Sequence, residues 1–186
     1  MGRESERAVD VRRVVTGRTA TGASVVVSDG SPPRAHAYEH IPGLAETLVW
    51  ATGDGAGTAA GAGADPTLSV RSYVPPTGGS RLIWLEIPPD TVFAEPGFDP
   101  VAARDEQLAV SPGLAERFEE ETPGMHATPT VDYAIVVAGE LGLELDDGHE
   151  TRLEPGDVVV QDGTRHAWRN HSDAPATLAV VLIGTG

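Results

Sequence analysis

The stretch GDVVVQDGTRHAWRN, residues 156–170, decides the fold of this chain. It begins as a β-branched run, passes through Asp162-Gly163, a dipeptide typical of hairpin turns, and resumes as a strand at His166. Upstream, a second histidine, His126, precedes another strand run that ends at Gly139. Two short antiparallel units that each open with a histidine are a common way for a small β-barrel to build a metal or substrate site.

The region around these units consists mainly of short β-branched runs separated by turn residues. We expect strands at Arg81–Ile87, Thr130–Ala138, Leu141–Leu145, Thr151–Leu153, Asp157–Gln161, His166–Asn170 and Ala176–Ile183. Many short strands at close spacing favour a sandwich or barrel, so the expected class is all-β. One or two short helices interrupt the pattern. The first is expected at Asp99–Val110, with Asp99 as N-cap and Pro100 at the first helical position, and a second turn at Leu114–Glu121.

The first eighty residues resemble an added β-rich extension. We therefore expect an N-terminal extension at residues 1–80 and a barrel at residues 81–186. Within the extension, Val9–Val15 and Ala23–Ser28 indicate a hairpin. The segment 52–65 is built almost wholly from Gly, Ala, Thr and Asp, which predicts a mobile loop because it buries little apolar surface.

Composition excludes several classes of function. The 186 residues suffice for one domain with a real core, and their net charge of −15 argues against nucleic acid or an anionic membrane as a partner. The chain has no cysteine, which excludes disulfides and thiolate catalysis. No apolar run has the pattern of a signal peptide or the length of a membrane span, so we expect a cytoplasmic protein.

Side chains alternate across a strand, which groups the polar residues of the two histidine segments. If both segments are extended, one face carries His126, Thr128, Thr130 and Asp132, and another carries His166, Trp168 and Asn170. We expect His126, Asp132 and His166 to act as catalytic residues and metal ligands, since two imidazoles and a carboxylate suit a divalent ion with open positions. Thr128, Trp168 and Asn170 are the expected substrate contacts.

The two segments resemble the signature motifs of the cupin superfamily, small barrels of the jelly-roll type. The first motif has His-x-His, then Glu, then Gly; this chain has His126, Thr128 in place of the second histidine, Asp132 in place of the glutamate, and Gly139. The second motif corresponds to Gly156, Gln161 in the proline place, Gly163, His166 and Asn170. The resemblance covers residues 81–183, and the first motif is divergent.

The resemblance implies a divalent metal ion such as Zn, Fe, Mn or Ni, but the usual third histidine is replaced by Thr128. Three alternatives follow: a three-ligand site, a weak site completed by substrate, or a site that has lost its metal. In the last case His126, His166 and Asp132 still supply acid and base groups, because histidine titrates near physiological pH.

Fold alone does not name a reaction. We expect an enzyme that acts on a small organic carbonyl, carboxylate or polyketide-like substrate in secondary metabolism, as a dehydratase, lyase, isomerase or cyclase. The alternatives are a non-haem metal oxygenase and a non-catalytic small-molecule-binding protein. We expect a homodimer. A third alternative is a purely structural role for the extension in dimer formation, by adding strands to a partner's sheet. His149 and His171 are expected on the surface.

Overall fold

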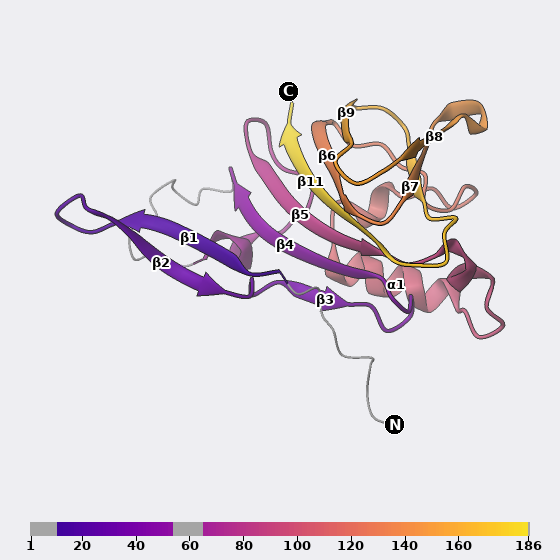
Figure 1. Ribbon diagram of the computed structural model, residues 1–186, viewed down its shortest axis with the longest axis horizontal. Coiled ribbons are helices and arrows are strands. Elements are labelled where there is room, and N and C mark those ends of the chain that lie inside the picture. Colours follow the sequence, from indigo (N-terminus) through magenta and orange to yellow (C-terminus); the bar gives the residue numbers. More distant parts are fainter. Residues whose placement is uncertain (1–10, 54–64, 186) are drawn as a thin grey trace.

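The computed structural model of the protein describes residues 11–53 and 65–185 (Figure 1). Its strands are β1 (Arg13–Arg18), β2 (Ser24–Gly30), β3 (Ala35–Ala37), β4 (Ala45–Thr52), β5 (Ser80–Ile87), β6 (Thr130–Ala138), β7 (Leu141–Glu144), β8 (Glu150–Leu153), β9 (Val158–Asp162), β10 (Ala167–Arg169) and β11 (Ala176–Gly184). One α-helix, α1 (Pro100–Val110), lies among them. No helix within these two ranges is long and apolar enough to cross a membrane.

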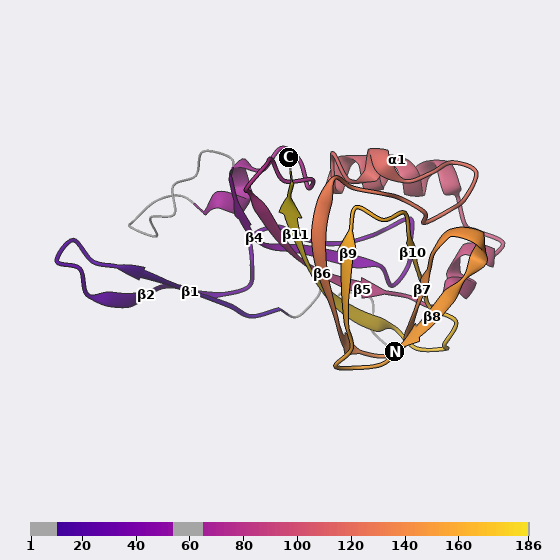
Figure 2. The same cartoon turned by 90° about the horizontal axis from the view of Figure 1, so that it is seen from above.

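Two antiparallel sheets enclose the main core. The larger sheet has the order β3-β4-β5-β11-β6-β9, and the smaller has the order β10-β7-β8. Figure 2, the view from above, shows β6, β9, β10 and β7 arranged around the barrel. Alternate residues of each strand face inward, so that Ala134 and Val136 of β6 pack with Leu178 and Val180 of β11. The expected all-β barrel with an N-terminal β region is confirmed.

The expected boundary at residue 81 does not separate two units. Strands β3 and β4, which lie within the expected extension, pair in the same sheet as β5, with Leu48 beside Ile83. Within the described residues of the expected extension, β1 and β2 pair with each other in a separate two-stranded sheet. The pairing of β4 with β5 joins residues that are distant in the sequence, such as Ala45 and Glu86, so local sequence patterns do not reveal it. Of the expected mobile loop at 52–65, residues 54–64 lie outside the described part of the chain.

Helix α1 begins where its capping residues predict. The Asp99 carboxylate accepts hydrogen bonds from the N–H groups of Val101 and Ala102, and Pro100 occupies the first turn. The second expected helix is reduced to a 3-10 turn at Ala115–Arg117. The segment after α1 therefore runs mostly as loop toward His126, and it covers part of the barrel.

Gly139, the glycine of the first motif, occupies a position that excludes a side chain. Its φ is 72°, and a Cβ there would lie 2.7 Å from Ala176 Cα and 2.8 Å from the Pro175 carbonyl oxygen. Gly148 has a similar φ of 70° with nothing near its Cβ position, so it is a matched control. We expect Gly139→Ala to lower the free energy of unfolding by about 2 kcal/mol more than Gly148→Ala, because only the first adds a clash to the backbone strain. Urea unfolding of both variants measures the difference, and equal losses would contradict it.

Candidate functional site

His126 and His166 are brought together by main-chain pairing. The His126 N–H donates to the His166 carbonyl at 3.0 Å, and the His166 N–H donates to the His126 carbonyl at 2.9 Å. This is the hydrogen-bonded pair of an antiparallel ladder, which sets two side chains on the same face. The imidazole centroids lie 4.3 Å apart. The sequence prediction that the two histidine segments meet is confirmed.

Both imidazoles have the same tautomer imposed by the backbone. Nδ1 of His126 lies 3.0 Å from the Gly124 carbonyl oxygen, and Nδ1 of His166 lies 2.9 Å from the Thr164 carbonyl oxygen. A carbonyl only accepts, so each Nδ1 carries the proton. Each neutral ring is left with a lone pair on Nε2, the atom that would accept a proton or bind an ion.

Burial keeps this pair neutral. It lowers the pKa of His126, which the Gly124 carbonyl and the charge of Glu119 partly oppose. Burial, together with a smaller effect of the neighbouring His126, lowers the pKa of His166 to about 4, against the opposing effect of the Thr164 carbonyl. Two adjacent imidazoles repel when both are charged, so the pair accepts one proton more readily than two.

The lowered pKa of His166 makes the protein sensitive to acid. A histidine titrates near pH 6.5 in the unfolded chain, so between pH 6.5 and 4 the unfolded state takes up a proton that folded His166 does not. The free energy of unfolding therefore decreases as the pH falls below 6.5, and at pH 5 the decrease is about 2 kcal/mol. Urea unfolding at pH 7.5 and pH 5 measures the loss, which we expect to shrink by that amount in His166→Gln.

His171 provides a control of opposite sign. It is exposed, and its hydrogen bond to Glu150 raises its pKa, so its contribution to stability is lost as the pH rises. His171→Gln is therefore expected to leave the loss between pH 7.5 and 5 in place. An acid loss that is unchanged in His166→Gln would contradict the buried, neutral state assigned to that imidazole.

Aromatic rings and an ion-pair network surround the histidines. The Phe118 ring lies 4.6 Å from His126 by centroid, and the Trp168 ring contacts His166 edge-on at 5.7 Å. The Arg165 guanidinium donates to both carboxylate oxygens of Glu119, at 2.6 and 2.7 Å. This bidentate pair ties the loop that carries His166 to the segment that carries Phe118. Trp168, an expected substrate contact, is thus a wall of the histidine site.

Asp132 lies in a second polar cluster. It is buried on β6 and pairs across the ladder with Gln161 of β9. Burial raises the pKa of Asp132, and the hydroxyls of Thr130 and Thr128 oppose that shift. The two hydroxyls lie 2.6 Å from each other. Asp132 Oδ1 and Gln161 Nε2 are both buried without a hydrogen-bond partner among the described residues, so this cluster holds an unused acceptor and an unused donor.

The expected metal centre of His126, Asp132 and His166 does not fit this geometry. In residues 11–53 and 65–185, no three His, Asp or Glu side chains are grouped so as to hold one ion. Strand parity predicts a common face, but the chain bends at Pro129, between His126 and Asp132. The neighbours of Asp132 are the threonine hydroxyls instead of the imidazoles. We therefore assign no chemical step to a metal.

Asn170 is hydrogen-bonded within the fold, and its expected contact with substrate stays a prediction. Its amide nitrogen donates to the carbonyls of Ile87 and Ala174, and its amide oxygen accepts from the N–H and hydroxyl of Ser172. Every hydrogen-bonding group of this buried side chain is therefore occupied. The asparagine fixes the turn that follows β10.

Sequence reasoning missed Gln161 and Phe118. Gln161 had a detectable signal, since it occupies the proline place of the second motif and is a polar residue directly after three valines. Phe118 had none, because its contact with His126 depends on how the loop after α1 folds back. Two surface depressions of about 240 and 260 Å³ lie beside His171 and beside Tyr73, and neither includes the histidine pair.

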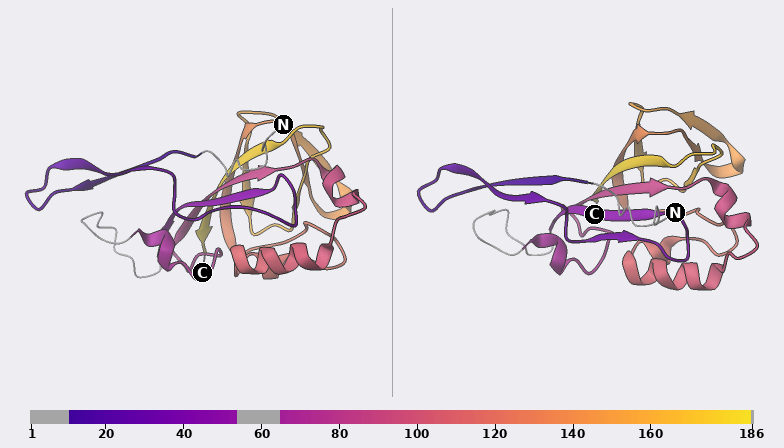
Figure 3. Two further views of the ribbon diagram at one scale, coloured as in Figure 1. Left: turned by 90° about the horizontal axis from the view of Figure 1, so that it is seen from below. Right: turned by 60° about the horizontal axis from the view of Figure 1, so that its bottom comes forward.

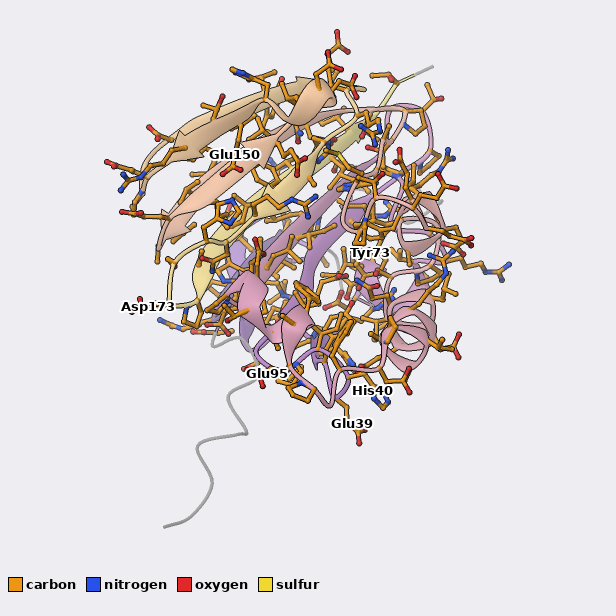
Figure 4. All side chains as sticks on the ribbon, turned by 90° about the vertical axis from the view of Figure 1, so that its right-hand side faces the viewer. Glu39, His40, Tyr73, Glu95, Glu150 and Asp173 are labelled. Atoms are coloured by element: carbon orange, nitrogen blue, oxygen red, sulfur yellow. The ribbon has the colours of Figure 1, made fainter. Side chains whose placement is uncertain are left out.

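A third buried cluster lies around Glu46 of β4. The Tyr38 hydroxyl donates to Glu46 Oε2 at 3.3 Å, while Oε1 has no partner among the described residues. Burial raises the pKa of Glu46 to about 7, against the effect of hydrogen bonds from Tyr38 and Tyr73. Figure 4 labels Tyr73, which lies between the sheet and the helix. The sequence analysis did not identify this cluster.

Comparison with known proteins identifies the class that this fold and these motifs define. The model of the cupin domain family matches residues 117–182. Residues 117–182 are thus similar to a cupin domain, and a β region lies ahead of the matched residues.

The chain is similar to proteins of fungal biosynthetic clusters. It is 44% identical over 74 residues to "Oryzines biosynthesis cluster protein J" of Aspergillus oryzae, which covers 38% of this chain and 41% of the relative. It is 32% identical over 83 residues to "Cupin-domain-containing oxidoreductase fogC" of Aspergillus ruber, which covers 41% of each. The chain thus spans about two fifths of the length of these curated relatives.

Solved structures are more distant. A sugar phosphate isomerase of the cupin superfamily from Silicibacter pomeroyi is 17% identical, with a TM-score of 0.41, over 78% of this chain and 62% of the other. A likeness at this level bears on neither activity nor substrate.

Proposed function

We propose that this protein is an enzyme that acts on a small organic molecule of secondary metabolism by proton transfer at His126 and His166. One observation is central to the proposal: both imidazoles are buried, neutral and locked with an unprotonated Nε2 on the same face. General bases need this state and this orientation. The cluster names of relatives such as the oryzines protein support a small-molecule substrate.

The proposed reaction moves a proton within the substrate. One imidazole removes a proton from a carbon beside a carbonyl group, and the electron pair left behind forms an enolate. The proton then returns at another position, which gives an isomer or a ring-closed product, or it leaves with a hydroxyl group as water. None of these outcomes needs an oxidant, so isomerase, cyclase and dehydratase chemistry all remain within the proposal.

The Asp132 cluster is proposed to orient the substrate. The unused Gln161 N–H is a donor suited to a carbonyl oxygen, and the unused Asp132 oxygen is suited to a hydroxyl. A substrate that carries both a carbonyl and a hydroxyl group can form hydrogen bonds with both buried polar groups, so such a substrate is favoured. An analogue that lacks either one leaves a buried group unpaired and should bind more weakly.

Oxidation of the substrate is the second candidate function. It is favoured by the names of several relatives, which are described as cupin-domain-containing oxidoreductases. In such a reaction the substrate loses two electrons and two protons, and an acceptor such as dioxygen takes up both and leaves as hydrogen peroxide. The histidine pair would again take the first proton.

Deletion of the gene in a producing strain tests the proposal. We expect a small molecule to accumulate in the deletion strain, and the purified protein to convert it. Mass spectrometry of the product separates the candidates: unchanged mass or loss of water supports proton transfer, whereas loss of two hydrogens or gain of oxygen supports oxidation. A compound that raises the melting temperature of the protein but is never converted would contradict both and indicate a binding protein.

A further inference from the structure

The histidine pair is buried beside a segment that has little regular structure. His166 is 3% exposed and His126 is 9% exposed. Figure 3 shows α1 lying across one end of the barrel, and the chain after α1 runs back to the start of β6. We call residues 116–123 of this connection the strap. Ala115 and Met125, which flank it, are both buried, so the strap is anchored at its two ends.

The strap does not pair with the barrel through its main chain. Among the described residues, the backbone hydrogen bonds of the strap stay between positions 114 and 125, as in the bond from the Glu119 N–H to the Met125 carbonyl at 2.8 Å. Segments that lack a ladder of hydrogen bonds to the core open locally at a low free energy. The strap is therefore the part of the chain around the histidines that opens most easily.

Two arginines of the barrel hold the strap through their side chains. Arg165 makes the bidentate ion pair with Glu119, and Arg169 Nη1 donates to the Pro123 carbonyl at 2.9 Å. We call the Glu119–Arg165 ion pair the latch. Its two side chains are 38% and 33% exposed, so water and salt weaken their attraction. The strap is thus held by a contact that breaks and forms again readily.

The latch lies one residue away from both the cover and the histidine pair. Phe118 directly precedes Glu119, and its ring lies 4.6 Å from the His126 ring by centroid. Arg165 directly precedes His166. Formation of the ion pair therefore brings the segment that carries the phenyl ring against the segment that carries the second imidazole.

We propose that the strap opens and closes over the histidine pair, and that the Glu119–Arg165 latch holds it closed. The proposal rests on the proton-transfer function proposed for the pair, because a base must reach its substrate. The strap contains four glutamates and one arginine, so its net charge is negative and the arginines of the barrel attract it. Closure then excludes water from the imidazoles, and opening admits the substrate.

Modification of the histidines with diethyl pyrocarbonate at neutral pH tests the strap without a substrate. The reagent acylates an accessible neutral imidazole at its unprotonated nitrogen, and peptide mass spectrometry assigns each product to a residue. In the wild type we expect His126 and His166 to react far more slowly than His149, which is exposed in the same chain. Raising the salt from about 0.1 to about 1 M shortens the screening length from about 10 to about 3 Å, and this should speed the reaction of the pair.

Variants of the latch give the second part of the test. Glu119→Gln and Arg165→Gln should each raise the rate at the pair about fivefold, the factor expected from one partly exposed ion pair. The double variant should add nothing, since both changes remove the same contact, and the acceleration by salt should disappear. Glu140→Gln is the matched control. It breaks a 2.6 Å ion pair with Arg152 at the opposite end of β6 from His126, and it should leave the rate unchanged.

Three results would overturn the proposal. Equal rates at His166 and His149 in the wild type mean that the pair is not covered. Wild-type rates in both latch variants mean that the ion pair does not hold the cover. A rise in Glu140→Gln as large as in Glu119→Gln means that loss of any ion pair loosens the fold. If circular dichroism shows that a latch variant does not fold, the response of the wild type to salt still decides.

These outcomes are independent of the proposed reaction because no turnover is measured. Failure of the proposed function would appear instead as unchanged turnover when His126 and His166 are replaced. Failure of the strap would appear as rates of modification that depend on neither the latch nor salt.

Discussion

Replacement of His166 with asparagine is expected to lower turnover of the accumulated compound by about a hundred- to ten-thousand-fold, the usual contribution of a general base. The main chain of residue 166, which pairs with His126, is unchanged by the substitution. Asparagine can also keep a donor toward the Thr164 carbonyl but offers no basic nitrogen at the Nε2 position. Steady-state kinetics should show the loss mainly in kcat. The same substitution at His126 tests the other half of the pair.

The control for this experiment is His149→Asn, which removes an exposed histidine from the turn between β7 and β8. It should leave turnover unchanged. If His126→Asn and His166→Asn both retain wild-type kcat, the pair is not the base. If turnover falls only because the variants unfold, the melting temperature will fall in parallel, and kcat measured well below that temperature will recover.

Glu46→Gln is expected to stabilise the protein at alkaline pH. Burial raises the pKa of Glu46 to about 7, so between pH 4.5 and 7 the unfolded chain releases a proton that the folded chain keeps. The contribution of protonated Glu46 to stability is therefore complete below pH 4.5 and is lost as the pH rises through 7. The stability of the variant relative to wild type should rise by about 3 kcal/mol between pH 4.5 and pH 8, because glutamine stays neutral throughout.

The dependence of the stability difference on pH separates the effect of Glu46 ionisation from the effect of any altered hydrogen bond. An amide in place of the carboxyl shifts stability equally at every pH, whereas relief from ionisation appears only as the pH rises. Glu120→Gln removes a charge at a side chain that is 83% exposed and lies outside the cluster, so it is the matched control. Urea unfolding at both pH values measures the two differences. A constant offset for Glu46→Gln would mean that Glu46 ionises normally in the fold.

Local pattern was enough to predict most of the barrel. Thr130–Ala138 was predicted with its observed bounds, because its alternation of buried and exposed residues is regular and its turn at Gly139 is sharp. Asp99 and Pro100 fixed the start of α1. The membership of β3 and β4 in the larger sheet was missed, since it depends on pairing with β5, far along the chain.

The site was predicted in part. Motif spacing predicted that His126 and His166 meet, and main-chain pairing brings them together. The alternation of side chains along a strand placed Asp132 on the same face as the two histidines. That alternation holds only along an unbroken strand, and the bend at Pro129 interrupts the strand between His126 and Asp132. The hydrogen bonds that Asn170 makes with Ile87 and Ser172 depend on how the turn after β10 folds, so the sequence alone does not identify these partners. Contacts that depend on loop closure, such as Phe118 on His126, have no local signature.

The two histidines are held by their own peptide groups and by carbonyls two residues upstream, Gly124 and Thr164. At these two positions the backbone that fixes the geometry does not depend on which side chain it carries. A lineage can exchange either imidazole for another side chain and keep the frame that presents it, so new reactivity is reachable by single substitutions. For the protein engineer, residues 126 and 166 are positions at which other functional side chains can be introduced without changing the backbone that holds them.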